Sequence, residues 1–293
     1  MKFKKIFLII ILSIFIITCT GCVNKREEKE KIQIVTSFYP VYIMTKNITN
    51  NIDNVSVENM SDTNVGCIHE YTLKPQDLKK IERADVFIEN GLGIESFNDK
   101  ILNIAKNVKI IESAKNINGY IQEDENEING HTWTSIDNNI SQVKAITEEL
   151  IKIDNSNSQK YKENEEIYIK KLEELKAKYN YKLGNLDDKK AICLNESFLY
   201  LLSDLKLEVT EIHTDHEEST ISAEELKNII EKMKNENIEI IVIDKNDNDK
   251  NAKTLQKETN AKIYKLNSCM NGDMDLDSYI HDMEENLSVL SDI

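Results

Sequence analysis

Short apolar runs rich in β-branched residues alternate along this chain with longer stretches of helical periodicity. Four runs lie in the first half and four in the second: Ile32–Val35, Val55–Glu58, Val86–Ile88, Val108–Ile111, Ala191–Leu194, Glu208–Ile212, Ile238–Ile243 and Lys262–Leu266. Strands that alternate with helices are typical of parallel sheets covered by helices on both faces. The pattern therefore predicts an α/β fold of two Rossmann-like lobes.

A highly charged stretch between the two halves carries one apolar stripe. Its members fall at spacings of 7, 4, 3 and 4 residues: Tyr161, Tyr168, Leu172, Leu175 and Tyr179. These spacings keep the side chains on one face of a helix of about 25 residues. A single helix that joins two lobes favours a rigid connection over a wide hinge.

Two other helices have recognisable start signals. Pro75 suits the first turn of a helix that continues through Leu78 and Ile81. Ser222 and Glu225 have the spacing of a capping box, in which each side chain satisfies a backbone N–H of the first turn. We therefore expect helices that begin at these two points.

The N-terminus reads as a targeting segment. Lys2, Lys4 and Lys5 precede the apolar run Ile6–Ile17, which has the length of a signal-peptide core and is short for a membrane span. The run ends at Cys19-Thr20-Gly21-Cys22, which resembles the lipobox of bacterial lipoproteins, and this predicts lipidation of Cys22. An ordinary secretory signal with an incidental cysteine is the alternative.

These signals divide the chain into five parts. We expect a lipoprotein signal peptide at 1–21, a charged tether at 22–31 and an N-terminal lobe at 32–155. The connecting helix is expected at 156–187 and the C-terminal lobe at 188–293.

Charge and cysteine content narrow the function. The 293 residues carry a formal net charge of −15, which argues against a nucleic-acid partner because phosphate binding needs a basic face. After removal of the signal peptide and lipidation of Cys22, three cysteines remain: Cys67, Cys193 and Cys269. Burial as small apolar residues is the ordinary state of such thiols.

Two histidines mark the expected ligand cleft. His69 and His131 each lie in a loop that contains a glycine and precedes a helical stretch. In open α/β sheets, ligands bind beyond the carboxyl ends of the strands, where such loops gather. Because neutral imidazole is a common ligand of zinc and other transition metals, the pair is a candidate metal site.

Seven segments together resemble the zinc- and manganese-binding lipoproteins of bacterial ABC importers. The resemblance extends over nearly all of the chain beyond the signal peptide, and the segments that carry it are Gly66–Leu78, Ala84–Val86, Asn90–Glu95, Gly130–Trp133, Asn195–Tyr200, Thr254–Leu266 and Tyr279–Leu287. The first segment, with its Gly-x-x-His-x-Tyr core and following helix, is the most specific of them.

The resemblance implies a fold, a site and a role. It implies two lobes joined by a rigid helix, with one metal ion in the cleft between them. The cargo would be Zn²⁺, with Mn²⁺ as the alternative. The protein would be a monomer, anchored by lipid to the outer face of the cell membrane, that passes the ion to an ABC permease and catalyses no reaction.

Residue by residue, the resemblance is incomplete. His69 and His131 match the family's first and second ligands. The third position, usually His or Glu, falls on Asn195, and the fourth, usually Asp, falls near Asn267. A neutral amide oxygen is a poor replacement for imidazole or carboxylate around zinc.

Several outcomes are open for the incomplete site. Glu196 adjoins Asn195 and could supply a carboxylate, and His216 follows a second-lobe strand and could supply an imidazole. Each cysteine stands two residues from a motif position, so thiolate ligation is a further candidate. Loss of metal binding is the fourth outcome.

Two other functional classes compete with metal capture. A surface interaction protein or adhesin could keep the fold with a degenerate metal site. A metal-dependent hydrolase would need three protein ligands, a bound water and a general base. Glu196 or Glu70 could act as that base, but no enzyme motif supports either.

Overall fold

The computed structural model describes residues 31–61, 68–97, 100–101, 106–122, 128–184, 186–187, 189–211 and 221–293. The predicted signal peptide, the lipidation site Cys22, and the candidate ligands Cys67 and His216 lie outside these ranges. Residues Ile32–Ile293 form one compact unit. No helix in the described ranges combines the length and the apolar character needed to cross a membrane.

The first lobe is built around a four-stranded parallel sheet in the order β2-β1-β3-β4. Its strands are β1 (Ile32–Thr36), β2 (Val55–Asn59), β3 (Val86–Glu89) and β4 (Lys109–Glu112). Its main helices are α2 (Tyr39–Ile48), α3 (Pro75–Glu82) and α5 (Ile136–Ile153).

The second lobe repeats this topology. Its parallel sheet has the order β6-β5-β7-β8. Its strands are β5 (Lys190–Cys193), β6 (Glu208–Glu211), β7 (Ile240–Asp244) and β8 (Lys262–Leu266). Its helices are α7 (Leu199–Asp204), α8 (Ala223–Glu236), α9 (Lys250–Thr259) and α10 (Ser278–Leu290). The predicted α/β class with two parallel-sheet lobes is confirmed.

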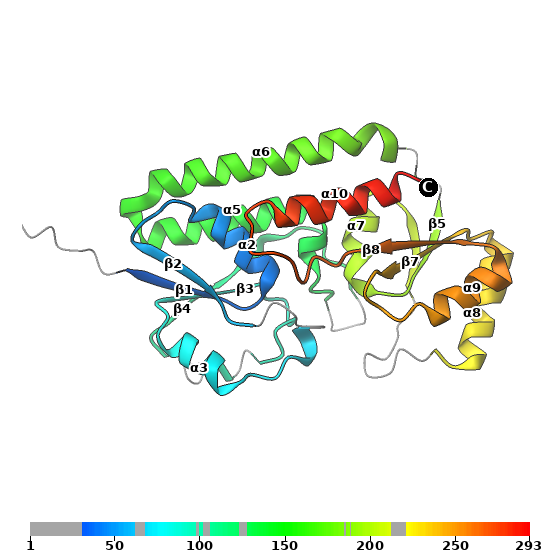
Figure 1. Cartoon of the computed structure of the whole chain (residues 1–293), viewed down its shortest axis with the longest axis horizontal. Helices are drawn as coiled ribbons and strands as arrows, with labels where there is room; N and C mark the ends of the chain where they lie inside the picture. Colours follow the sequence, from blue (N-terminus) through cyan, green and yellow to red (C-terminus); the bar gives the residue numbers. More distant parts are fainter. Residues whose placement is uncertain are drawn as a thin grey trace, which may run out of the picture. The chain divides into compact units, whose positions relative to one another are not determined.

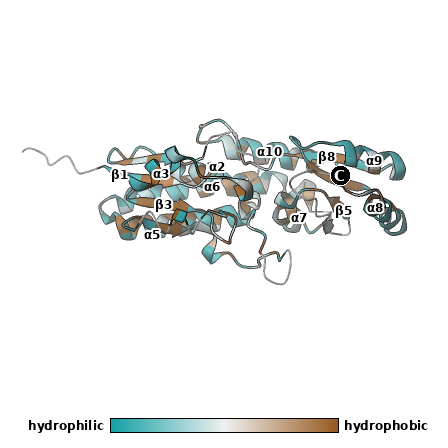
Figure 2. Ribbon diagram, turned by 90° about the horizontal axis from the view of Figure 1, so that it is seen from below, coloured by the Kyte–Doolittle hydropathy of each residue, from teal (hydrophilic) through white to brown (hydrophobic). Residues whose placement is uncertain are grey.

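Burial explains why the apolar runs become strands. All five residues of β7 and all four of β3 are buried, as expected where helices cover both faces of a parallel sheet. Figure 2 shows hydrophobic colour on strands such as β3, while α8 and α9 are mostly hydrophilic. Helices α8 and α9 therefore bury only a narrow apolar face and expose polar faces to water.

Helix α6 (Ser158–Leu183) is the predicted connecting helix and spans 26 residues. All five residues of its apolar stripe are buried. The helix runs alongside α5 and α10, so it packs on elements that belong to both lobes (Figure 1). This packing makes α6 a brace and not a free tether.

The two predicted helix starts are both observed. Pro75 is the first residue of α3, and the carboxylate of Asp77 accepts a hydrogen bond from the Lys74 backbone N–H at 2.8 Å. Helix α8 begins after Ser222, whose hydroxyl accepts from the Glu225 backbone N–H at 3.1 Å. These caps satisfy first-turn N–H groups that lack helical partners.

The segment between β8 and α10 returns the chain to the first lobe. The Tyr39 hydroxyl of α2 donates to the Asp273 carbonyl at 2.7 Å, and the Asn47 amide donates to the Leu276 carbonyl at 2.9 Å. A second-lobe loop is thus hydrogen-bonded to a first-lobe helix. Together with α6, it connects the two lobes.

Candidate metal centre

His69 lies in a short 3-10 helix, Ile68–Glu70, that leads into α3. Its backbone carbonyl accepts a hydrogen bond from the Ser96 hydroxyl at 2.7 Å, which ties this turn to the loop after β3. The His69 side chain is 28% exposed, so this residue lies on the solvent side of the site.

His131 immediately precedes the 3-10 helix Thr132–Thr134 and is almost fully buried. Its ring centroid lies 5.3 Å from that of His69 and 5.2 Å from that of Trp133. Trp133 in turn packs edge-on against Phe38 with centroids 5.0 Å apart. The His131 ring therefore packs between the rings of His69 and Trp133.

Glu196 comes from the second lobe, where it opens a 3-10 helix, Glu196–Phe198, just after β5. The Asn195 side chain caps this helix by accepting from the Ser197 backbone N–H at 3.0 Å. The site thus lies beyond the carboxyl end of a central strand at a point where the strand order reverses. This is where open α/β sheets bind ligands.

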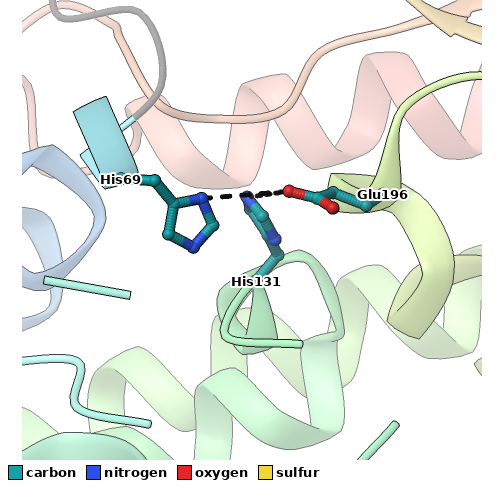
Figure 3. Close-up of side chains that lie close together, drawn as sticks. All are labelled: His69, His131 and Glu196. Carbon is teal, nitrogen blue, oxygen red and sulfur yellow. Dashed lines mark ion pairs between the residues drawn. The ribbon is translucent and has the colours of Figure 1, made fainter. Parts of the chain in front are cut away.

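The three side chains converge from both lobes (Figure 3). Glu196 Oε1 lies 3.9 Å from His69 Nδ1 and 3.9 Å from His131 Nε2. One ligand atom from each residue can be chosen so that all lie within 4.8 Å of one another. Tetrahedral zinc, with bonds of about 2.0–2.1 Å, separates its ligand atoms by about 3.3 Å. The two His–Glu separations would have to shorten by about 0.6 Å, and the widest pair, within 4.8 Å, by up to about 1.5 Å, to form a three-ligand zinc site.

The two asparagines of the incomplete motif point elsewhere. Besides capping its helix, Asn195 donates to the Asp247 carboxylate at 2.9 Å. Asn267 donates to Asp282 at 2.7 Å and accepts from the Cys269 backbone N–H at 3.0 Å. Glu196, and not Asn195, joins the histidines, so among the expected substitutes within the described residues it is the one that reaches the site.

The thiols that the structure describes are not members of this cluster. Cys193 and Cys269 are buried, and neither belongs to the His-His-Glu group among the described residues. Cys193 donates to the Asn195 carbonyl at 3.1 Å. Burial raises the pKa of the Cys269 thiol well above its usual value, which disfavours a thiolate. The remaining candidates, Cys67 and His216, lie outside the described residues.

The first lobe supports the site through a buried carboxylate. Glu95 accepts hydrogen bonds from the Ser37 hydroxyl at 2.8 Å and from the backbone N–H groups of Asn90 at 2.7 Å and Gly91 at 3.0 Å. Burial is the main cause that raises the pKa of Glu95 to about 7. These bonds organise the loop that carries Ser96, whose hydroxyl holds the His69 backbone.

Sequence reasoning missed Asn129, which is fully buried beside the cluster. Its side-chain oxygen lies 3.2 Å from His131 Nδ1, and its side-chain nitrogen donates to the Glu196 carbonyl at 3.1 Å. The one signal in the sequence was that Asn129 is a polar residue two positions before the candidate ligand His131. Its partner in the second lobe could not be foreseen from the sequence.

Two parallel-sheet lobes with a His-His-Glu cluster at their junction define the class of two-lobed metal-binding proteins. The chain belongs to the family described as "Zinc-uptake complex component A periplasmic", whose model matches residues 34–293. The resemblance inferred from the motifs is therefore confirmed.

Two curated relatives represent both metals. The chain is 25% identical over 310 residues to the manganese ABC transporter substrate-binding lipoprotein PsaA of Streptococcus anginosus, covering 99% of this chain and 98% of PsaA. It is 28% identical over 308 residues to the zinc-binding lipoprotein AdcA of Streptococcus pneumoniae, covering 98% of this chain. The match spans only 60% of the longer AdcA.

Solved structures agree with the fold. The substrate-binding protein FpvC of Pseudomonas aeruginosa, in complex with Ni²⁺, has a TM-score of 0.80 at 25% identity, with 90% of this chain and 96% of FpvC covered. A mutant of the laminin-binding adhesin Lmb of Streptococcus agalactiae has a TM-score of 0.76 at 25% identity, with 89% and 98% covered.

Proposed function

We propose that this chain captures a divalent transition metal outside the cytoplasm and delivers it to an ABC permease. The observation that carries the proposal is the convergence of His69, His131 and Glu196 from two lobes. Two imidazole nitrogens and a carboxylate oxygen, all within 4.8 Å of one another, are available to bind a cation. Because the three come from both lobes, a bound ion would also hold the lobes together.

Zinc is the preferred cargo and manganese the alternative. Two imidazoles with a carboxylate are a common zinc ligand set. The same nitrogen and oxygen donors also suit manganese, particularly if water completes the coordination. PsaA is named for manganese and AdcA for zinc, which supports the same two candidate metals.

The anchor and the partner follow from the same proposal. Cleavage before Cys22 and lipidation of that residue would attach the chain to the outer face of the cell membrane, with 22–31 as a tether. A monomer on such a tether can reach the outer face of a membrane permease. Binding and release complete this role, so the cluster needs no catalytic base.

Calorimetric titration of the soluble chain from Val23 onward tests the proposal. The protein is stripped with chelator and titrated with Zn²⁺ and Mn²⁺ beside the double variant His69→Ala/His131→Ala. Exposed His281 in α10 supplies the matched control, His281→Ala. One tight equivalent of metal in the native chain and the control, lost in the double variant, would support capture.

An adhesin of the same fold is the second candidate, favoured by the likeness to Lmb. In that case the chain would bind a host surface protein whether or not it binds metal. The absence of tight binding of either metal in the titration would contradict capture and favour this alternative.

A further inference from the structure

Asn129 connects the two lobes directly behind the metal cluster. It is fully buried and lies in the first lobe, two residues before His131. Its side-chain oxygen accepts from the His131 backbone N–H at 2.8 Å, while its side-chain nitrogen donates to the Glu196 backbone carbonyl at 3.1 Å. One amide group therefore contacts two of the three candidate ligands.

These two partners fix the orientation of the amide. A backbone N–H can only donate and a backbone carbonyl can only accept. If the amide were turned over, its NH₂ group would face the His131 N–H and its oxygen would face the Glu196 carbonyl, and neither hydrogen bond could form. The oxygen that faces the His131 backbone also lies 3.2 Å from His131 Nδ1. Because this oxygen can only accept, Nδ1 must carry a proton to form a hydrogen bond there.

The Nδ1–H form leaves the lone pair of a neutral imidazole on Nε2. That nitrogen is the one that lies 3.9 Å from Glu196 Oε1, on the side of the ring where the cluster converges. In metal proteins, a partner on the distal ring nitrogen commonly sets the tautomer and orientation of the ligand histidine. The Asn129 oxygen stands in that place here.

The backbone of Asn129 adds a second connection to the other lobe. Its carbonyl accepts a hydrogen bond from the Tyr200 hydroxyl of α7 at 2.9 Å. The same hydroxyl accepts from the Ile121 backbone N–H at 3.1 Å. Asn129 therefore bonds the second lobe at two points, and a displacement of Glu196 would act on the residue that orients His131.

We propose that Asn129 is a positioning residue that fixes the tautomer of His131 through its side-chain oxygen and couples it to Glu196 through its side-chain nitrogen. The consequence for metal affinity rests on the proposed function. The tautomer and the link between the lobes exist in the metal-free chain and can be tested without metal.

Two variants and one control separate the roles of the side-chain oxygen and nitrogen of Asn129. Asn129→Ala removes both the acceptor and the donor. Asn129→Asp keeps an acceptor for His131 but loses the donor to Glu196. Asn235, exposed on α8, supplies the matched control Asn235→Asp.

The first readout is the ¹⁵N spectrum of the His131 ring in the metal-free chain at alkaline pH, where the imidazole is neutral. We expect the Nδ1–H form in the native chain, in Asn129→Asp and in the control, and a mixture of tautomers in Asn129→Ala. A native chain in the Nε2–H form, or an unchanged tautomer in Asn129→Ala, would overturn the first half of the proposal.

The second readout is hydrogen exchange of the backbone amides in the 3-10 helix Glu196–Phe198. We expect faster exchange in both Asn129 variants than in the native chain and the control. Equal exchange in all four would overturn the link between the lobes. If Asn129→Ala does not fold, Asn129→Asp still tests this link, and the tautomer of the native chain still tests the other half.

Zinc affinity measured by calorimetry completes the test. Loss of an outer-shell partner typically weakens metal binding by about 10–100-fold, and we expect a loss in this range for Asn129→Ala. If the native chain binds zinc and Asn129→Ala binds it with the same affinity, the positioning role would be contradicted. A native chain that binds no metal would contradict the proposed function and leave the two metal-free readouts to decide on Asn129.

Discussion

The indole Nε1–H of Trp133 donates a hydrogen bond to the backbone carbonyl of Ser268 at 2.9 Å. Trp133 follows the candidate ligand His131 in the first lobe, and Ser268 follows β8 in the second. The Trp133 carbonyl in turn accepts from the Tyr279 hydroxyl of α10 at 2.6 Å. The residue that packs against His131 is thus bonded to the second lobe by both its side chain and its backbone.

Replacing Trp133 with Phe should therefore lower the free energy of unfolding. The substitution leaves the buried Ser268 carbonyl without this donor, and an unsatisfied buried group costs about 1–3 kcal/mol. Urea unfolding followed by circular dichroism measures the change. Tyr120→Phe, at a half-exposed aromatic residue, is the control and should change stability by much less. Equal stability of the two variants would contradict a structural role for the indole hydrogen bond.

Metal binding should be visible in the fluorescence of the chain. Trp133 is its one tryptophan, and its ring centroid lies 5.2 Å from that of His131. A cation held by His131 would place positive charge beside the indole, so zinc should change the emission with a one-to-one end point. His131→Ala should abolish this response and His281→Ala should keep it. A response that survives in His131→Ala would place the bound ion elsewhere.

Glu95 should make the stability depend on pH. Its pKa is raised from 4.5 to about 7 in the folded chain, mainly by burial, so the native state holds a proton that the unfolded state releases. The stability contributed by this group is therefore fully present below about pH 4.5 and is lost as pH rises through about 7.

Glu95→Gln provides the test of this dependence. An amide cannot accept all three hydrogen bonds that Glu95 accepts, so the variant should be less stable overall. It should also lack the fall in stability that the native chain shows between pH 4.5 and about 7. Urea unfolding across this range measures both effects. The same slope in native chain and variant would assign the pH dependence to other groups.

The brace formed by α6 can be tested on its two faces. Leu172 on the apolar stripe is fully buried, whereas Ile167 on the same helix is 59% exposed. Leu172→Ala should lower the free energy of unfolding by about 2–5 kcal/mol, because it removes buried methyl groups and leaves a cavity. Ile167→Ala should change it by less than about 0.5 kcal/mol. Similar losses from both would mean that α6 does not bury this stripe.

Much of the fold could be predicted because each element carries a local signal. The β-branched run Ile240–Ile243 is buried as a central strand, and the stripe from Tyr161 to Tyr179 is buried on one helix. Helix starts at Pro75 and Ser222 depend only on neighbouring residues. Such features follow from periodicity and capping, which act within a few residues of each other.

The site could be predicted only in part. His69 and His131 belong to a recognisable motif, but the choice between Asn195 and Glu196 depends on which side of the chain faces the other lobe. Asn195 has an extended backbone, so its side chain and that of its neighbour point in different directions. The sequence does not reveal which of these directions leads to the histidines.

Asn129 shows the same limit more strongly. Its partners Glu196 and Tyr200 are 67 and 71 residues away along the chain. No local pattern encodes a hydrogen bond between lobes, because it exists only once both lobes have folded and packed. Residues that orient the ligands without binding the metal are therefore found in the structure and not from sequence motifs.

The most direct test of the central claim is a crystal structure of the zinc-loaded chain with anomalous diffraction recorded at the zinc edge. The account predicts one strong anomalous peak bonded to His69 Nδ1, His131 Nε2 and Glu196 Oε1, with distances of about 2.0–2.2 Å. A zinc peak bonded to other residues would contradict it. So would the absence of zinc between His69, His131 and Glu196 in protein that has bound a full equivalent of zinc.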